Sequence, residues 1–235
     1  MSVKTKLKKL PRNLKALFNC RISYGQFGED LFLTHLLGYG DQGVFVDIGC
    51  FHPIVFSNSY VFYQRGWRGL AIDPNPQLKA AWDRYRPGDT FLNLAIAKTP
   101  GKMAFLAHNQ HPTMNMVLDG SQVAGFDAAN YKVTSCVASP LSSILEEHVH
   151  GKRIDLLNVD CEGRDVEVLE TNDFEKYRPT VIAVEDTDVS LETNAAKFLQ
   201  GRDYECRAYI GLTKIFQDRT QRDRWREFDV DFPTS

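Results

Sequence analysis

The sequence predicts a single α/β domain built on a doubly wound, mainly parallel sheet. Three observations lead to this fold class. Short apolar runs recur along the chain and end in an acidic residue, as residues 44–48 do with Asp47. Segments with helical spacing separate these runs, which is the pattern of successive βαβ units. The length of 235 residues, with 43% apolar and 25% charged residues, suits one ordinary globular domain.

The expected strands alternate with helices along most of the chain. The first strand is Val44–Ile48, and the second spans residues 69–73, one βαβ unit later. Further strands are expected at residues 90–96, 133–138, 154–160 and 180–185. An antiparallel hairpin is expected at residues 204–209 and 213–216. Helices are expected at residues 31–37, 60–63, 77–85, 140–147 and 166–174, and near Phe198.

Residues 97–132 are the least regular part of the sequence. Residues 102–106 are expected to form a strand at an edge, and no clear periodicity follows them. A long irregular loop in a compact domain is often a lid or a substrate-binding insertion. His108 and His111 are three positions apart, as in some metal sites, but no third ligand lies nearby in the sequence. We therefore expect a lid or an insertion here.

Basic residues are concentrated at the start of the chain. Residues 1–28 contain seven lysines and arginines and no acid. Leucines at helical spacing predict a basic amphipathic extension over residues 1–22, before a catalytic domain at residues 23–235. The extension either docks on an anionic membrane surface or a partner, or packs on its own domain.

Composition excludes several classes of protein. The net charge of −2 gives no overall attraction to nucleic acid. No apolar run approaches the roughly 20 residues of a membrane-spanning helix. The five cysteines are scattered without a CxxC pair, which predicts reduced thiols in a cytoplasmic protein. Peripheral contact with a membrane and assembly into a homo-oligomer remain open.

A candidate ligand site lies at the carboxyl end of the first strand. Ligands of open α/β sheets bind in the crevice at this edge. Asp47 can hold an amine or a hydroxyl, and Gly49 lets the backbone approach a ligand closely. Ser57 and Asn58 precede a helix whose N-terminus favours a carboxylate or a phosphate. Gln26, in a glycine-flanked loop, either contacts a ligand or belongs to a helix cap.

The second and third strands supply further candidates. Asp73 ends the second strand, where dinucleotide-binding folds hold ribose hydroxyls, and Pro74 opens the turn that follows. Ala95 is small enough to let a flat ring lie against the backbone, although core packing explains it equally well. His52 is the only histidine beside an expected strand end. It is either a base or a structural histidine bonded to the backbone.

Acidic residues also end the later strands. Asp47, Asp160 and Glu185 are expected on neighbouring strands, about 4.8 Å apart. Carboxylates this close repel unless they share a cation, a proton or a polar ligand. Asp160, Glu162 and Glu185 therefore either bind a hard divalent ion such as Mg²⁺ or Mn²⁺, or include a base with a raised pKa. Otherwise they cap helices or pair with arginines such as Arg164.

Six short segments occur in a recognisable order between about Ser23 and Glu185. They are residues 45–49, 52–53, 57–59, 66–69, 73–76 and 155–165. Together they resemble the FkbM family of S-adenosylmethionine-dependent methyltransferases. The resemblance implies a class I methyltransferase fold, which is a Rossmann-like, doubly wound sheet of seven strands with a terminal antiparallel hairpin. It also implies O-methylation, commonly of sugars in surface polysaccharides, glycolipids or secondary metabolites.

The resemblance also implies roles for residues of this sequence. Asp47 and Gly49 belong to the loop that holds the methionine part, Asp73 takes the ribose hydroxyls, and Ala95 lies near the adenine. Phe51 departs from the pattern, because many methyltransferases have a second glycine of the loop there. The expected cofactor-binding residues are Gln26, Asp47, Gly49, Ser57, Asn58, Asp73, Pro74, Ala95 and Asp160.

The expected reaction centre follows from the same resemblance and from the chemistry. A sugar hydroxyl is a poor acid, so a group near it must take its proton as the methyl group is transferred. Asp160 and Glu162 are the expected catalytic pair, with Glu185 in support and His52 as the rival base. The same three carboxylates are the tentative metal ligands.

We therefore expect an O-methyltransferase that acts on a sugar hydroxyl in a nucleotide sugar, a surface polysaccharide or a glycolipid. Two alternatives stay open. A nicotinamide-dependent oxidoreductase uses a similar sheet, but no GxGxxG follows the first strand. A non-catalytic nucleotide-binding scaffold of a glycan-assembly complex would fit the basic N-terminus.

Overall fold

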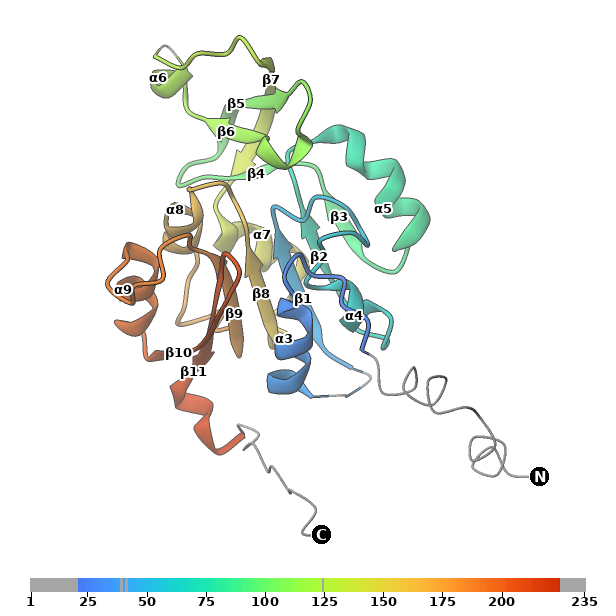
Figure 1. Cartoon of the computed structure of the whole chain (residues 1–235), viewed down its shortest axis with the longest axis vertical. Coiled ribbons are helices and arrows are strands. Elements are labelled where there is room, and N and C mark those ends of the chain that lie inside the picture. The colour runs from blue at the N-terminus through green and yellow to red at the C-terminus, as the bar shows by residue number, and fades with distance from the viewer. Residues whose placement is uncertain (1–20, 39, 41, 124, 225–235) are drawn as a thin grey trace, which may run out of the picture.

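The computed structural model describes residues 21–224, except residues 39, 41 and 124 (Figure 1). The basic helix that the sequence predicts near the N-terminus falls on residues 1–20, outside the described part of the chain. The described residues form two sheets with helices packed around the larger one.

The larger sheet has seven strands in the order β10-β11-β9-β8-β1-β2-β3. Neighbouring strands are parallel, except that β11 runs antiparallel to both β9 and β10. The expected α/β organisation around a large sheet is confirmed. The strands are β1 (Val44–Ile48), β2 (Arg68–Ile72), β3 (Thr90–Leu92), β8 (Leu156–Val159), β9 (Val181–Glu185), β10 (Tyr204–Ile210) and β11 (Thr213–Asp218).

Alternating side chains of the strands bury both faces of this sheet under helices. Phe45 of β1 packs with Leu33 and Phe62 on one face, whereas Val46 packs with Leu141 on the other. The first face carries α3 (Glu29–Leu37), α4 (Tyr60–Tyr63), the 3₁₀ helix η1 (Pro76–Leu78) and α5 (Lys79–Tyr85). The second face carries α7 (Leu141–His148), α8 (Asp165–Glu170) and α9 (Asn194–Gln200). A 3₁₀ helix, η3 (Arg219–Arg224), follows β11. Among the described residues, no helix has the length and apolar character needed to cross a membrane.

A second sheet replaces the irregular segment that the sequence predicts at residues 97–132. Its four strands lie in the order β4-β7-β5-β6, beyond the carboxyl ends of the parallel strands (Figure 1). They are β4 (Ala95–Ile96), β5 (Gly101–His108), β6 (Met116–Leu118) and β7 (Tyr131–Ser139), with η2 (Pro112–Met114) and α6 (Gly120–Val123) between them. The strands expected at residues 102–106 and 133–138 are confirmed as parts of β5 and β7, which pair over eight residue positions. The expected edge position is wrong, because β5 lies between β7 and β6, and the irregular structure expected after it gives way to β6 and two short helices.

The expected third strand, residues 90–96, is also divided between the two sheets. β3 ends at Leu92, and β4 begins at Ala95 and pairs with β7. The Asn93 side chain donates to the Asp73 carbonyl at 2.9 Å, which fixes the turn between the two strands. The second sheet is thereby attached directly beside the end of β2.

A fully buried arginine connects α5 to the middle of the larger sheet. Arg86 Nε pairs with Asp89 at 2.7 Å, with both side chains inaccessible to solvent. Its Nη1 donates to Ser59 Oγ at 2.9 Å, and Ser59 Oγ donates to the Asp47 carboxylate. The guanidinium also lies 4.4 Å from the centre of the Trp82 ring. A buried charge of this kind is tolerated only when ion pairs and hydrogen bonds satisfy it.

We expect Arg86→Met to lower the free energy of unfolding by about 3–5 kcal/mol, because it leaves the carboxylate of Asp89 buried without its partner. Urea denaturation measures the difference. Lys79→Met is the matched control, because Lys79 pairs with Asp83 on the surface of α5. That variant should lose about 1 kcal/mol or less. Equal losses in the two variants would contradict the role assigned to Arg86.

Candidate active site

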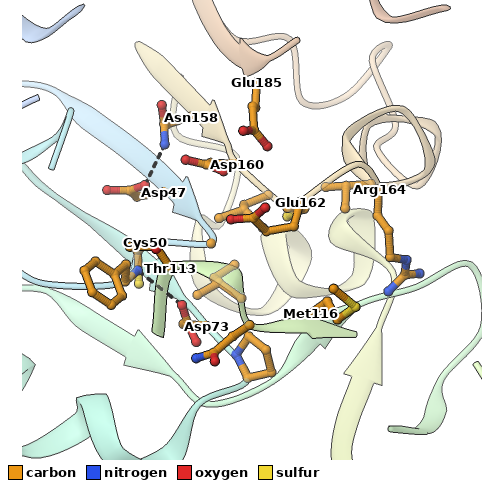
Figure 2. A pocket seen from close by; sticks show the side chains of 18 of the residues that line it. Asp47, Cys50, Asp73, Thr113, Met116, Asn158, Asp160, Glu162, Arg164 and Glu185 are labelled. Atoms are coloured by element: carbon orange, nitrogen blue, oxygen red, sulfur yellow. Dashed lines mark hydrogen bonds between the residues drawn. The ribbon is translucent and has the colours of Figure 1, made fainter. Parts of the chain in front are cut away.

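A cavity of about 320 Å³ lies between the carboxyl ends of the larger sheet and the second sheet (Figure 2). The ends of β1, β2, β8 and β9 form its floor, and residues 112–117 of the second sheet form part of its wall. This is the edge at which open α/β sheets bind ligands. The lid or insertion that the sequence predicts here is thus an ordered part of the cavity.

The turn after β1 is shaped by two residues with positive φ. Gly49 has φ 73°, and a Cβ atom there would lie 1.7 Å from the Asp160 carbonyl oxygen, so only glycine fits. Phe51 has φ 41°. Its N–H donates to Asp73 at 3.1 Å, and its carbonyl accepts from Trp82 Nε1 at 3.1 Å. These two bonds hold a backbone conformation that a glycine adopts without help.

Asp47 is buried beneath this turn and accepts two hydrogen bonds. Asn158 Nδ2 donates to one oxygen at 2.9 Å, and Ser59 Oγ donates to the other. Asn58 Nδ2 in turn donates to Asn158 Oδ1 at 3.1 Å. Burial raises the pKa of Asp47, while the bond from Ser59 and the charge of Arg86 oppose that shift. Asp47 is therefore a fixed acceptor in the wall of the cavity.

Asn158 is a site residue that our sequence analysis missed. It lies beside Asp47 in the register between β1 and β8, and both side chains line the cavity. The signal was present, because Asn158 is the one polar side chain within the apolar run of β8. A polar residue in a buried strand must find a partner, and here the partner is the first predicted acid.

Asp73 follows β2 and faces the cavity next to Pro74 and Ala95. Its two oxygens accept from the backbone N–H groups of Phe51 at 3.1 Å and Asn75 at 2.8 Å. Burial raises the pKa of Asp73 to about 6, although these two bonds lower it. The carboxylate is thus oriented by the backbone and keeps lone pairs for a ligand hydroxyl.

Asp160, Glu162 and Glu185 face one another across the cavity (Figure 2). Desolvation by the cavity wall raises the pKa of Asp160 well above its usual range, and the charges of Glu185, Asp165 and Glu162 raise it further. Solvent still reaches Asp160 through the open cavity. Desolvation also raises the pKa of Glu185. The expected juxtaposition of these acids is therefore present, and their crowding favours a shared proton.

Glu162 occupies a strained position at the centre of this cluster. Its φ is 51°, and Gly163 follows with φ 87°. Asp165 fixes the loop by accepting from the N–H groups of Cys161 at 2.9 Å and Gly163 at 3.2 Å. Desolvation, followed by the charges of Glu185 and Asp165, raises the pKa of Glu162 to about 7. A carboxyl with this pKa is half ionised near neutral pH, as a general base requires.

Arg164 does not neutralise the three acids. Its guanidinium points away from them (Figure 2) and binds Glu167 through two contacts of 3.0 and 2.6 Å. The alternative that the acids pair with Arg164 is therefore not supported.

The metal-ligand set that the sequence suggested is not supported either. Among the described residues, no group of three or more histidine, cysteine, aspartate or glutamate side chains has an arrangement suited to a metal ion. We assign no step to a metal.

Two predicted site residues lie outside the cavity lining. His52 Nδ1 accepts from the N–H groups of Ile54 at 3.1 Å and Val55 at 3.0 Å, which is the structural role that the sequence left open. Ser57 Oγ accepts from the N–H of Tyr60 and so caps α4. The remaining predicted residues line the cavity: Gln26, Asp47, Gly49, Asn58, Asp73, Pro74, Ala95, Asp160, Glu162 and Glu185.

Comparison with known families identifies the family of the chain. The model of the methyltransferase FkbM domain matches residues 47–208. The chain belongs to the FkbM methyltransferase family. The match begins at Asp47 within β1 and ends within β10, so β11 lies beyond it. It includes the second sheet and the three acids Asp160, Glu162 and Glu185. No curated protein matches the chain.

The raised pKa of Glu162 predicts a pH dependence of stability. A carboxyl whose pKa is higher in the folded state contributes stability below about pH 4.5, and this contribution is lost as the pH rises through about 7. Glu162→Gln removes that loss. We expect its free energy of unfolding to rise relative to the parent between pH 5 and pH 8, by roughly 1 kcal/mol at this solvent-screened position. Urea denaturation at both pH values measures this difference. Glu147→Gln, which replaces an exposed glutamate, is the control, and its free energy of unfolding relative to the parent should be the same at both pH values.

Proposed function

We propose that this FkbM methyltransferase transfers a methyl group from S-adenosylmethionine to a hydroxyl group of a sugar. One observation carries the proposal: two carboxyl groups with different properties line the same cavity. Backbone N–H groups orient the Asp73 carboxylate, which can accept hydrogen bonds from ribose hydroxyls. Glu162 has a pKa of about 7, which suits a general base. Nucleotide sugars, surface polysaccharides and glycolipids are the candidate carriers of the sugar. We also propose that the protein acts in the cytoplasm at the surface of a membrane, which its basic N-terminal residues would contact.

The strand order supports a class I methyltransferase fold. Strand β11 lies antiparallel between β9 and β10, and the remaining strands are parallel with helices on both faces. Such a doubly wound, Rossmann-like sheet binds its ligand at the carboxyl edge. The proposed site lies at that edge.

The cavity suits the proposed cofactor by the chemistry of its side chains. Asp73 offers oriented carboxylate oxygens to ribose hydroxyls, and Ala95 leaves a flat apolar surface beside them. Asn58 Oδ1 is buried without a hydrogen-bond partner and lies on the cavity wall near Asp47, where it can accept from an ammonium group. The carboxylates of the acidic cluster would offset the charge of a sulfonium.

The proposed chemistry needs little from the protein beyond alignment and a base. S-adenosylmethionine supplies a methyl group on a sulfonium that is already activated. The acceptor oxygen gains the methyl group as the carbon–sulfur bond breaks, and the sulfonium becomes a neutral thioether. Glu162 takes the hydroxyl proton in the same step. Asp160 and Glu185 hold the acceptor hydroxyl in line for attack.

Two alternatives fit the site less well. An NAD-dependent oxidoreductase needs a glycine-rich turn for the pyrophosphate, and this chain has Phe51 in the corresponding turn. A non-catalytic nucleotide-binding scaffold gives no reason for a carboxyl with a pKa of about 7 in the cavity.

Calorimetry tests the choice of cofactor. We expect S-adenosylmethionine and S-adenosylhomocysteine to bind and NAD not to bind. Asp73→Ala should weaken the binding of S-adenosylhomocysteine by about 10- to 100-fold, because hydrogen bonds to a charged group are lost. Asp83→Ala, which removes an exposed carboxylate from α5, is the matched control. If neither sulfur compound binds, the proposal is wrong.

A second experiment tests the base. We expect Glu162→Gln to lower kcat by about 10²–10⁴-fold and to keep the affinity for S-adenosylhomocysteine, since the amide cannot take a proton. The kcat/KM of the parent should rise with pH through about 7, as Glu162 ionises, and the variant should lose this step. Full activity of the variant with an unchanged pH profile would exclude Glu162 as the base.

A further inference from the structure

The described residues that line the cavity carry charge of mostly one sign. One arginine and no lysine or histidine accompanies six carboxyl side chains: Glu29, Asp47, Asp73, Asp160, Glu162 and Glu185. Three of the six are satisfied from within the protein. Arg86 reaches Asp47 through Ser59, and backbone N–H groups donate to Asp73 and to Glu29, which is 2% exposed.

The other acids face the space where an acceptor must enter. Within the described part of the chain, Asp160, Glu162 and Glu185 form no ion pair with a lysine or arginine, because the nearby Arg164 is held by Glu167. Desolvation, followed by the charges of Glu185 and Asp165, raises the pKa of Glu162 to about 7. A ligand that brings a further negative charge into this space is repelled, and a neutral ligand is not.

Large apolar side chains surround the same space. Phe27, Phe56, Met114 and Leu212 come from four separate segments, and all four line the cavity. Each is well exposed, from 37% for Leu212 to 51% for Phe56. Scattered exposed apolar residues need no explanation, but four that converge on one cavity form a surface for an apolar ligand.

The hairpin at the end of the sheet determines where Phe27 lies. Gly211, in the turn between β10 and β11, has φ 60°, and a Cβ atom there would lie 2.1 Å from Phe27 Cδ2. The glycine therefore lets the Phe27 ring rest directly on the turn, next to Leu212. The rim of the cavity thus combines the first described loop of the chain with the terminal hairpin.

Building on the proposed methyl transfer, we propose that the acceptor is an uncharged hydroxyl compound with an apolar portion, such as a glycoside with an aryl or alkyl group. The apolar portion contacts Phe27, Phe56 and Met114 at the rim, and the reacting hydroxyl reaches Glu162. Acceptors with a phosphate near the hydroxyl, which include nucleotide sugars, are rejected by the acidic cluster. The acceptor loses one proton to Glu162 and gains one methyl group.

A matched acceptor panel tests this inference on the full chain with S-adenosylmethionine as donor. Each pair in the panel compares a 4-nitrophenyl glycoside with the nucleoside diphosphate derivative of the same sugar. Mass spectrometry detects the added methyl group. We expect methylation of at least one aryl glycoside, with kcat/KM about tenfold or more above that of its nucleotide partner.

Rim variants test the apolar contact. Phe27→Ser and Met114→Ser should each raise the KM for the aryl glycoside about three- to tenfold and leave the affinity for S-adenosylhomocysteine unchanged. Val137→Ser is the matched control, because Val137 is 58% exposed in the second sheet and does not line the cavity. It should leave the KM unchanged.

The possible failures are distinguishable. If S-adenosylhomocysteine binds but nucleotide sugars are methylated as well as the aryl glycosides, or no uncharged glycoside is methylated, the inference is wrong and the proposed cofactor assignment stands. If S-adenosylhomocysteine does not bind, the proposed function is itself wrong, and this inference with it.

Discussion

The site depends on a buried chain of polar contacts that runs from Arg86 through Ser59 and Asp47 to Asn158. Each member satisfies the next, and the chain links α5, the loop before α4, β1 and β8. A carboxylate without such partners would be costly at this depth, since burial already raises the pKa of Asp47. The network therefore allows Asp47 to lie at the floor of the cavity, because the positive charge of Arg86 stabilises its carboxylate through Ser59. It also fixes Asn158, whose carbonyl accepts from Asn58.

The acidic cluster of Asp160, Glu162 and Glu185 differs from Asp47, because no arginine or lysine of the described residues offsets its charge. Asp160, Glu162 and Glu185 are brought together at the ends of β8 and β9 without a cation from the described part of the chain. Desolvation raises the pKa values of all three, and neighbouring carboxylates raise those of Asp160 and Glu162 further. Asp47 is satisfied by hydrogen bonds and by the charge of Arg86, whereas Glu162 has a pKa suited to proton transfer. The backbone strain at Glu162 is placed where the chemistry is proposed, and Asp165 holds the loop in that conformation.

Much of this arrangement could be predicted from sequence, because it follows from local patterns. Apolar runs that end in acids placed Asp47, Asp73 and Glu185 correctly at one edge of a parallel sheet. Strands at residues 102–106 and 133–138 were also predicted, but their assembly into a separate second sheet could not be predicted in this way. β5 and β7 have no consistent alternation of buried and exposed residues, and their pairing joins segments about 30 positions apart. Asn158 stands out in the sequence as a polar residue within an apolar strand, but its partner Asp47 lies more than 100 positions away, so local spacing could not assign its role. Roles that depend on long-range contacts are invisible to periodicity.

The turn at Phe51 shows how a departure from a family pattern can be compensated. A glycine at this position would adopt the positive φ without strain, and phenylalanine does so at a cost. Two hydrogen bonds offset that cost, one to Asp73 and one from Trp82. The first of them also orients the carboxylate that we propose for ribose binding. Because the turn and Asp73 hold each other in place, phenylalanine at this position keeps the proposed ribose site intact. The part of the cavity that we propose to distinguish one acceptor from another is instead the rim formed by Phe27, Phe56 and Met114.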